Sequence, residues 1–424
     1  MSVRLAWALV CALALSIGHV ELAHAASGTL TLQRALQRAL GANPRLTSAE
    51  RDIGMASGRR IQAGAIPNPD VSAELDDALG SGPYRGTRSA ETTLLLGQLV
   101  ELGGKRDARI AIGSAEVESA TWQRAALRLE ILSETATAFY NVLGAQRRVQ
   151  ILDTQVAALD RLTPLLQRRV DAGAASPAET ARGQVAADLV KAERERARTS
   201  LAIFRRELAI LMGGDAPDFA QVAGDFTFVG TPPPFRAIVA SLEANPQLMR
   251  WTAIRAQRDA ELLAARLKPV PDVRVTAGWR HYRDTNDNAV RLGLSIPIPV
   301  FDRNQGGIVE AQEARAKVES ERAAARATLI LTLGRAYETL IGAANEVRLL
   351  RAGALQNSRQ ALQAIEDGYA QGRFSLLELL DAQSSSAQVS LREAEALINF
   401  HTAAAVLEGL TGVPLRFVRQ GSNR

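Results

Sequence analysis

The chain has 424 residues, of which 47% are hydrophobic and 22% are charged. Its 50 basic and 45 acidic side chains are interleaved along the sequence and leave a net charge of only +5. Mixed charge of this kind is typical of solvated helix faces and argues against nucleic acid as a partner. The only cysteine is Cys11, which excludes a disulfide framework and a cysteine-based metal site.

The first residues are typical of a secretory signal peptide. Arg4 gives a positive start, residues 5–17 are apolar, and Ala23–Ala25 has the small-x-small pattern of a cleavage site. The apolar run is short for a membrane-spanning helix, which needs about 20 residues. We expect residues 1–25 to be removed on export. Because Ala26 and not cysteine follows the cleavage site, we do not expect a lipoprotein.

Most of the remaining sequence is rich in Ala, Leu, Arg, Glu and Gln, which favour helix. In one proline-poor stretch, Ile131, Thr135, Phe139 and Val142 mark an apolar face at helical spacing. We expect long helices at about 103–172, 176–213, 304–368 and 375–411. Helices of about 60 residues are roughly 90 Å long, so the sequence predicts an elongated molecule.

Two segments, about 69–100 and 270–300, change from helical spacing to a period of two. In the second segment, two alternating runs flank the turn-rich loop Asp284–Asn288. Its apolar positions are Val273, Val275, Ala277, Trp279, Leu292, Leu294 and Ile296. Each segment is therefore expected to form a β-hairpin with one apolar face and one polar face that contains glycine.

In an exported protein, strands with such alternation also fit the lipid-facing wall of a β-barrel. A hairpin in lipid cannot leave its edges open, because the bilayer core has no water to bond unpaired backbone groups. Four strands from one chain cannot enclose a pore, so several chains would have to share one barrel. We expect Leu294 to tolerate a charge poorly, and Arg280 and Arg291 on the polar face to tolerate change far better.

The sequence also repeats itself after about 200 residues, a period too long for a solenoid. Ala42–Leu46 returns as Ala244–Leu248, and Pro69–Val71 returns as Pro271–Val273. The repeat indicates a duplicated unit of helix, hairpin and two long helices. We divide the chain into a first repeat at 26–215, a linker at 216–235, a second repeat at 236–414 and a tail at 415–424.

These parts together resemble the TolC-like outer-membrane efflux proteins. Leu32–Leu46 is similar to the family's opening helix, and Gln98–Arg106 is similar to its first strand-to-helix junction. Ile296–Gly307 (IPIPVFDRNQGG) resembles the second junction in the form typical of the CzcC-type branch, which serves heavy-metal efflux. Tyr369–Gly372 and Leu377–Ala382 look like the periplasmic tip.

The resemblance implies a mainly α fold with transmembrane β-structure. Three chains of that family share a 12-stranded outer-membrane barrel, to which each contributes four strands. The barrel continues into a long antiparallel α-helical tunnel through the periplasm. A membrane-fusion adaptor and an inner-membrane RND pump dock on the tunnel. An irregular equatorial region lies part-way along it, and here residues 216–235 and the tail are the candidates.

The resemblance also implies a gate at the tip. Glu378 and Asp381 match the two acidic positions that ring the pore constriction in TolC, although exposed carboxylates near a helix start are also common where no pore exists. Tyr369 matches a tyrosine that hydrogen-bonds across the tip, and Glu179 is its expected partner. The family arginine two residues after Gly372 is replaced here by Phe374; the adjacent Arg373 is the candidate substitute.

Beyond the leader the chain keeps only His281 and His401, and it has no HxxxH or HExxH pattern. The sequence therefore predicts no tight metal site and no cofactor. It also contains no GxSxG, Walker loop or other catalytic set, so we do not expect an enzyme. A conduit has to release its cargo, so a metal exporter of this kind needs no tight site.

The main hypothesis is a trimeric exit duct for heavy-metal cations of the cobalt, zinc and cadmium type. A duct for drugs or other small organic molecules is the alternative within the same class. A periplasmic coiled-coil spacer is the alternative from another class. Such a spacer would have similar helices, but it would not need two hairpins with apolar faces.

Overall fold

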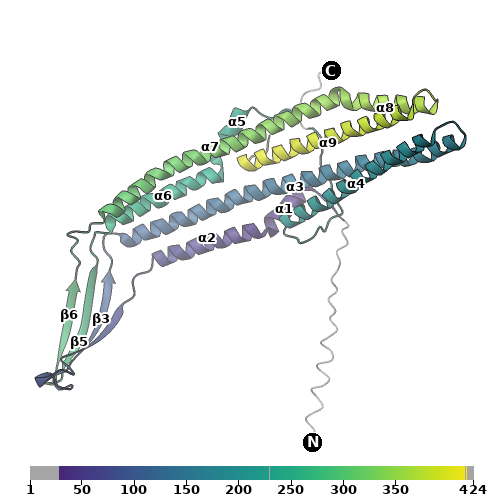
Figure 1. Cartoon of the computed structure of the whole chain (residues 1–424). Coiled ribbons are helices and arrows are strands. Elements are labelled where there is room, and N and C mark those ends of the chain that lie inside the picture. Colours follow the sequence, from purple (N-terminus) through teal and green to yellow (C-terminus); the bar gives the residue numbers. More distant parts are fainter. Residues whose placement is uncertain (1–27, 229, 416, 418–424) are drawn as a thin grey trace, which may run out of the picture.

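The computed structural model describes residues 28–415 and 417, with a gap at residue 229. The expected leader at 1–25 lies outside the described residues, as does the tail after residue 417. The described chain is a long layer of helices with a small β-sheet at one end (Figure 1). Among its helices, none is both long and apolar enough to cross a membrane.

The first repeat has the expected order of elements. They are α1 (Leu32–Ala42), α2 (Pro44–Ala63), β2 (Asp70–Asp76), β3 (Glu91–Val100), α3 (Lys105–Asp171) and α4 (Pro177–Leu211). The opening helix that the sequence suggested at 32–46 is divided at Asn43, which ends α1 and caps α2. At 67 residues, α3 is roughly 100 Å long.

The second repeat follows the same order with one departure. Its elements are α5 (Phe235–Ala240), α6 (Pro246–Leu267), β5 (Val273–Tyr282), β6 (Asp287–Ser295), α7 (Gln305–Leu349), α8 (Leu355–Ala370) and α9 (Leu376–Thr411). A π turn at Leu350–Ala354 lies between α7 and α8, within the span where the sequence predicts one long helix. A π turn admits extra residues into a helix without ending it.

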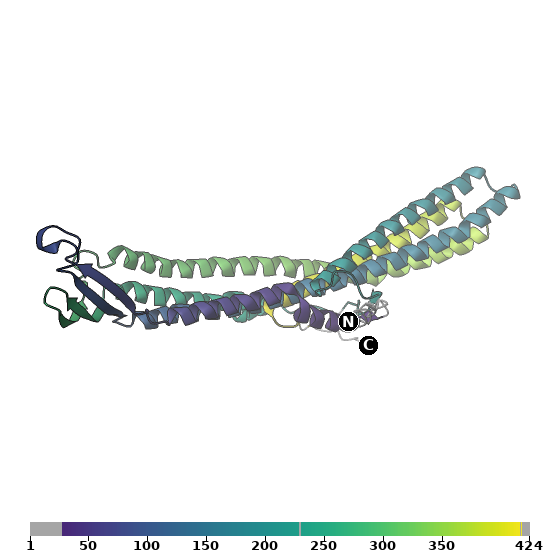
Figure 2. The ribbon, with the colours of Figure 1, turned by 90° about the horizontal axis from the view of Figure 1, so that it is seen from below.

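Helices and strands are arranged in one common order. Near the sheet, α2 packs on α3, α3 on α6 and α6 on α7. The strands follow in the order β2-β3-β5-β6, all antiparallel. Beyond the middle of α3, the neighbours become α4 on one side and α9 with α8 on the other. Figure 2 shows that these two halves of the helical layer meet at an angle.

The linker between the repeats crosses the molecule where the two halves meet. Its strand β4 (Gln221–Val222) pairs in parallel with β1 (Thr29–Leu30). The side chain of Gln146 on α3 donates to the carbonyl of Val222 at 3.0 Å and accepts from its N–H at 2.8 Å. Large buried side chains gather beside it, with Phe139 in one cluster and Phe400 in another. The linker is thus fixed to the helices near their middle.

The repeated Ala-Asn-Pro motif has a structural role. Asn43 and Asn245 are 4% and 3% exposed, and each side-chain oxygen caps the helix that follows. The side-chain N–H₂ groups donate to the carbonyls of Leu211 and Leu410 near the ends of α4 and α9. One residue type therefore pairs two helix ends in each repeat, which explains why the motif recurs.

We predict that Asn245→Ala lowers the free energy of unfolding by about 1–3 kcal/mol, because it leaves the partly buried carbonyl of Leu410 without its donor and removes the cap of α6. Thermal unfolding in detergent, followed by circular dichroism, measures the change. Asn399→Ala is the matched control, since Asn399 is exposed on α9, the helix whose end Asn245 contacts. Equal destabilisation by both variants would contradict this role for Asn245.

Candidate functional site

The sheet separates its side chains into two faces. Leu94 pairs with Ala73 and Trp279, and Val275 pairs with Leu294, which places most apolar positions of the four strands on one face. Leu292 and Leu294 are 77% and 66% exposed, so no described residue covers them. The positions expected to face lipid share it, except that Ile296 follows the last residue of β6 and is not part of a strand.

The opposite face is held together by ion pairs across the strands. Arg280 contacts Glu91 at 2.6 Å and donates to Thr93 at 2.8 Å. Its side chain is only 21% exposed, so the expectation that Arg280 tolerates replacement is not supported by its contacts. Arg291 lies 3.7 Å from Glu74 and both side chains are about half exposed, an arrangement that contributes little to stability.

The acidic partners of these arginines were not singled out from the sequence. Asp70, Glu74 and Asp76 lie at even spacing on β2, which places them on one face of the strand. Asp70 pairs with Arg274 and Asp76 with Arg280. The alternation of acidic side chains in the first hairpin could therefore have predicted that these residues pair with the arginines of the second hairpin.

Two strand edges remain unpaired in the protomer. The pairing of β3 with β5 joins the two hairpins, which leaves β2 and β6 as the outer strands of the four-stranded sheet. Because the four strands alternate in direction, β2 and β6 run in opposite directions. A further β2 could therefore add to β6 in the antiparallel manner found throughout this sheet.

At the other end of the molecule, two helical turns close the chain. Gly173 and Gly372 have φ values of 71° and 74°, a conformation that glycine adopts at low cost. In each turn the next residue donates back to the helix, from Ala174 to Arg169 and from Arg373 to Gly368, both at 2.8 Å. The two turns thus have the same geometry, and Leu166 near the end of α3 packs against Leu379 near the start of α9.

Glu378 is engaged at the start of α9. Its carboxylate accepts from the backbone N–H of Ser375 at 2.7 Å and from the Ser375 hydroxyl at 2.8 Å, completing a capping box. These hydrogen bonds from Ser375 lower the pKa of Glu378. The cap therefore contributes fully above the ordinary pKa of a glutamate and is lost as the pH falls through the lowered value.

Asp381 lies one turn further along α9. It is exposed, and the described residues give it no ion pair or side-chain hydrogen bond. Glu378 and Asp381 are three residues apart and so share one face of the helix. The two expected gate residues are brought together, but of the two only Asp381 has a carboxylate without a partner among the described residues.

Tyr369 and Glu179, the two residues expected to form a latch across the tip, do not contact each other in the expected way. Glu179 and Tyr369 are not joined by a hydrogen bond, and the Tyr369 hydroxyl is buried without a partner among the described residues. Instead the guanidinium of Arg169 lies 5.2 Å from the centre of the Tyr369 ring, within the range of a cation–π contact. Arg169, which the sequence did not single out, connects the end of α3 to the end of α8.

Arg373 does not replace the missing family arginine in the protomer. Its side chain is exposed and makes no ion pair among the described residues, and only its backbone N–H is bonded, to Gly368. Phe374 folds back so closely over Gly368 that an added Cβ would collide with its ring. The tip turn is therefore closed by an aromatic contact on a glycine.

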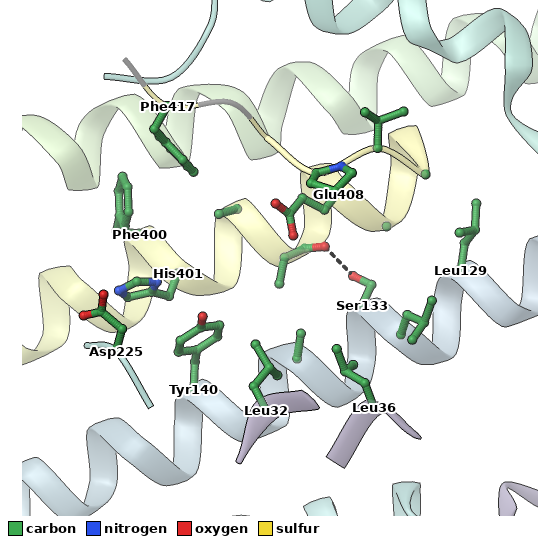
Figure 3. Close-up of a pocket in the computed structure, with 18 residues that line it drawn as sticks. Leu32, Leu36, Leu129, Ser133, Tyr140, Asp225, Phe400, His401, Glu408 and Phe417 are labelled. Carbon is green, nitrogen blue, oxygen red and sulfur yellow. Dashed lines mark hydrogen bonds between the residues drawn. The ribbon is translucent and has the colours of Figure 1, made fainter. Parts of the chain in front are cut away.

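A cavity of about 330 Å³ lies at the middle of the molecule, between α3, α9 and the linker (Figure 3). His401, 6% exposed, stacks on Tyr140 with ring centres 4.5 Å apart, and its Nε2 lies 3.0 Å from the carbonyl of Thr227. Burial lowers the pKa of His401 and raises that of Glu408. His401 is thus a packed residue.

Within the described residues, no group of three or more His, Cys, Asp or Glu side chains is placed to hold a metal ion. His281 lies on β5, where its ring stacks on Trp279 and its Nδ1 is 3.1 Å from the Asn288 amide oxygen. The Asp225 carboxylate lies near His401 (Figure 3), but neither described histidine belongs to a group of three such side chains.

Residues 35–214 and 237–413 match the family described as outer membrane efflux protein. The chain is 30% identical to the cobalt-zinc-cadmium resistance protein CzcC of Cupriavidus metallidurans over 91% of both chains. It is 26% identical to the nickel-cobalt-cadmium resistance protein NccC of Alcaligenes xylosoxydans over 75% of this chain and 72% of that one.

Solved structures of CusC, which describe transmembrane channel formation by that protein, superpose with a TM-score of 0.76 at 15% identity. They cover 90% of this chain and 91% of that chain. This likeness confirms the TolC-like fold, and the matched residues include both repeats with their hairpins and long helices. The chain belongs to the outer membrane efflux protein family.

Proposed function

We propose that three copies of this chain form the outer-membrane exit duct of a tripartite efflux system that exports heavy-metal cations. A periplasmic membrane-fusion adaptor and an inner-membrane RND pump supply the energy and select the cargo. The observation that carries the proposal is the sheet, which has one exposed apolar face, one polar face and two open edges. Its strand β3 continues directly into α3, which is about 100 Å long. Residues 1–25 are the leader that directs export.

A lipid location accounts for the exposed apolar face. Side chains such as Leu292 and Leu294 are 77% and 66% exposed in the protomer, a large apolar area for a protein surface in water. In hydrocarbon the same face is favourable, but the edges of β2 and β6 are not. Three copies arranged in a ring pair every edge, with β2 of one copy on β6 of the next, and enclose a lumen lined by the polar face.

We predict that Leu294→Arg destabilises the inserted barrel by about 2–4 kcal/mol, the cost of an arginine on the lipid face near the bilayer midplane. The yield of assembled protein in the outer membrane measures the effect. Arg291→Gln is the control on the other face of the same strand, where the ion pair is weak. Similar losses for both variants would show that the apolar face does not meet lipid.

The cargo follows from the relatives. CzcC and NccC are named for resistance to cobalt, zinc, nickel and cadmium, and the likeness to CzcC extends over 91% of both chains. A passive duct needs weak contacts with its cargo, so selection belongs to the pump. We therefore assign divalent heavy-metal cations as the exported substrate.

A strain that lacks this chain should become several-fold more sensitive to cobalt, zinc or cadmium, because the last step of export is lost. Growth inhibition at graded metal concentrations measures this, and the reintroduced chain should restore tolerance. The same strain should keep its tolerance of organic drugs. Sensitivity to drugs alone would assign the duct to small organic molecules instead.

The gate lies at the periplasmic tip. In a ring of three copies, Glu378 and Asp381 form two stacked acidic rings that favour cations in a narrow aperture. Glu378 has a second role as the cap of α9, so its carboxylate is fixed in place and remains ionised at neutral pH. Asp381 supplies the carboxylate without a partner in the protomer. Tyr369 and Arg169 hold the two helical turns together beside it.

The double variant Glu378→Gln with Asp381→Asn should weaken cation selectivity and reduce block by multivalent cations in planar bilayers, because it removes both acidic rings. Glutamine keeps the capping-box pattern at this position, so α9 should remain intact. Asp188→Asn, which removes an exposed carboxylate from α4, should leave selectivity unchanged. Unaltered selectivity in the double variant would place the constriction elsewhere.

A further inference from the structure

The connection from β6 to α7, which we call the junction strap (Ile296–Arg303), leaves an apolar surface uncovered. Ile298 is 81% exposed and Phe301 is 90% exposed, the highest value for a large hydrophobic side chain in the described part of the chain. Pro297 and Pro299 lack an N–H group, so the strap cannot extend the ladder of β6. An apolar surface of this kind requires a partner other than a further strand.

The strap has a defined shape. Asn304, at φ 59°, donates from its side chain to the carbonyl of Ala265 on α6 at 2.9 Å. The Gln305 side chain donates to the carbonyl of Phe301 at 3.1 Å. A Cβ at Gly307 would lie 2.5 Å from the Asn304 side-chain oxygen, so a larger residue there would displace the Asn304 side chain. These contacts tie the strap to the helices behind it and hold its apolar side chains outward.

The equivalent connection of the first repeat, from β3 to α3, is contacted by another part of the same chain, although Leu102 remains 41% exposed. The contacting segment, which we call the covering segment, links α6 to β5. Asp272 of this segment accepts from the N–H of Leu102 at 3.1 Å and pairs with Lys105 at 2.9 Å. Val270 lies so close to Gly103 that an added Cβ would be 2.9 Å from its methyl group. Each strand-to-helix connection thus has a place for the linker of the repeat beside it.

The covering segment has a counterpart in the first repeat. Pro269–Asp272 corresponds to Pro67–Asp70, which links α2 to β2. That linker lies at the β2 edge of the sheet, whereas the strap lies at the β6 edge. The protomer therefore cannot place its own first linker on its own strap, and a second copy can.

We propose that the junction strap of each copy packs against the first linker, Gly64–Pro69, of the next copy. The inference rests on the proposed ring of copies and identifies the contact that closes it on the periplasmic side of the sheet. Ile61 and Ile66, 73% and 66% exposed at this margin, supply the apolar surface that meets Ile298 and Phe301.

Strand direction places the two segments at the same level. The strap begins directly after Ser295, the last residue of β6, and the linker ends directly before Asp70, the first residue of β2. When β2 of one copy adds to β6 of another in antiparallel order, the end of one strand lies beside the start of the other. The contact therefore needs no rearrangement of either segment.

Cysteine cross-linking tests the contact in the full chain, whose only natural cysteine is Cys11 in the expected leader. The pair Ile298→Cys with Ile66→Cys, treated with a mild oxidant in the membrane, should give covalent dimers and trimers that a reductant removes. Each single variant should remain monomeric on a denaturing gel. Ile298→Cys with Leu189→Cys, which joins two exposed sites on distant elements, is the collision control.

A second measurement tests the same contact in case the two cysteines are close but cannot adopt the geometry of a disulfide. A maleimide should label Ile298→Cys at least ten-fold more slowly in the assembled protein than in the unfolded chain, and a quencher carried by lipid should not reach the label. Rapid labelling and strong lipid quenching of Ile298→Cys would overturn the strap contact. If the particle in detergent still contains three chains, the proposed duct remains intact. A stable single-chain particle would overturn the duct itself.

Discussion

The backbone groups at the two outer strands impose the main constraint on this protein. Every N–H and C=O in hydrocarbon needs a partner, and an unpaired group costs several kcal/mol. One chain pairs its two hairpins through β3 and β5 and so removes two of its four edges. In the proposed membrane location, the edges of β2 and β6 make the protomer incomplete, and assembly becomes part of folding.

The duplicated sequence provides a simple way to meet that constraint. Each repeat contributes one open edge, β2 from the first and β6 from the second. The junction inside the chain shows how a strand-to-helix connection contacts the linker of the neighbouring repeat. The proposed contact between copies reuses that arrangement. It differs in chemistry, because Asp272 and Lys105 form an ion pair inside the chain, whereas Ile298 and Phe301 present apolar surface at the margin.

The helical part distributes its stability unevenly. Large aromatic side chains and the cap by Asn245 are concentrated at the middle, where the linker crosses the helices. The tip has only a small apolar cluster around Leu166 and Leu379, together with the contact between Arg169 and Tyr369. A segment with few buried contacts opens at lower free energy than the rest of a structure, which suits the part of a duct that has to open.

Local patterns in the sequence determined the helices, the hairpins and the division into repeats. Spacing of apolar side chains sets the face that a helix or a strand buries, and this signal is complete within ten or so residues. The apolar face of β5 and β6 was predicted for this reason. The spacing of Ser375 and Glu378 was also a readable capping signal, although its consequence for the proposed gate became clear only from the hydrogen bonds.

The tertiary structure decided which distant residues meet. Residues far apart in the sequence meet in the ion pair of Arg280 with Glu91 and in the contact of Arg169 with the Tyr369 ring. Tyr369 and Glu179, by contrast, form no hydrogen bond. No local pattern records such contacts, because they depend on how the two repeats pack side by side. The open edges of the sheet were also decided by the tertiary structure. Only the strand order β2-β3-β5-β6 shows that β2, β6 and the junction after β6 lack a neighbour on one side among the described residues.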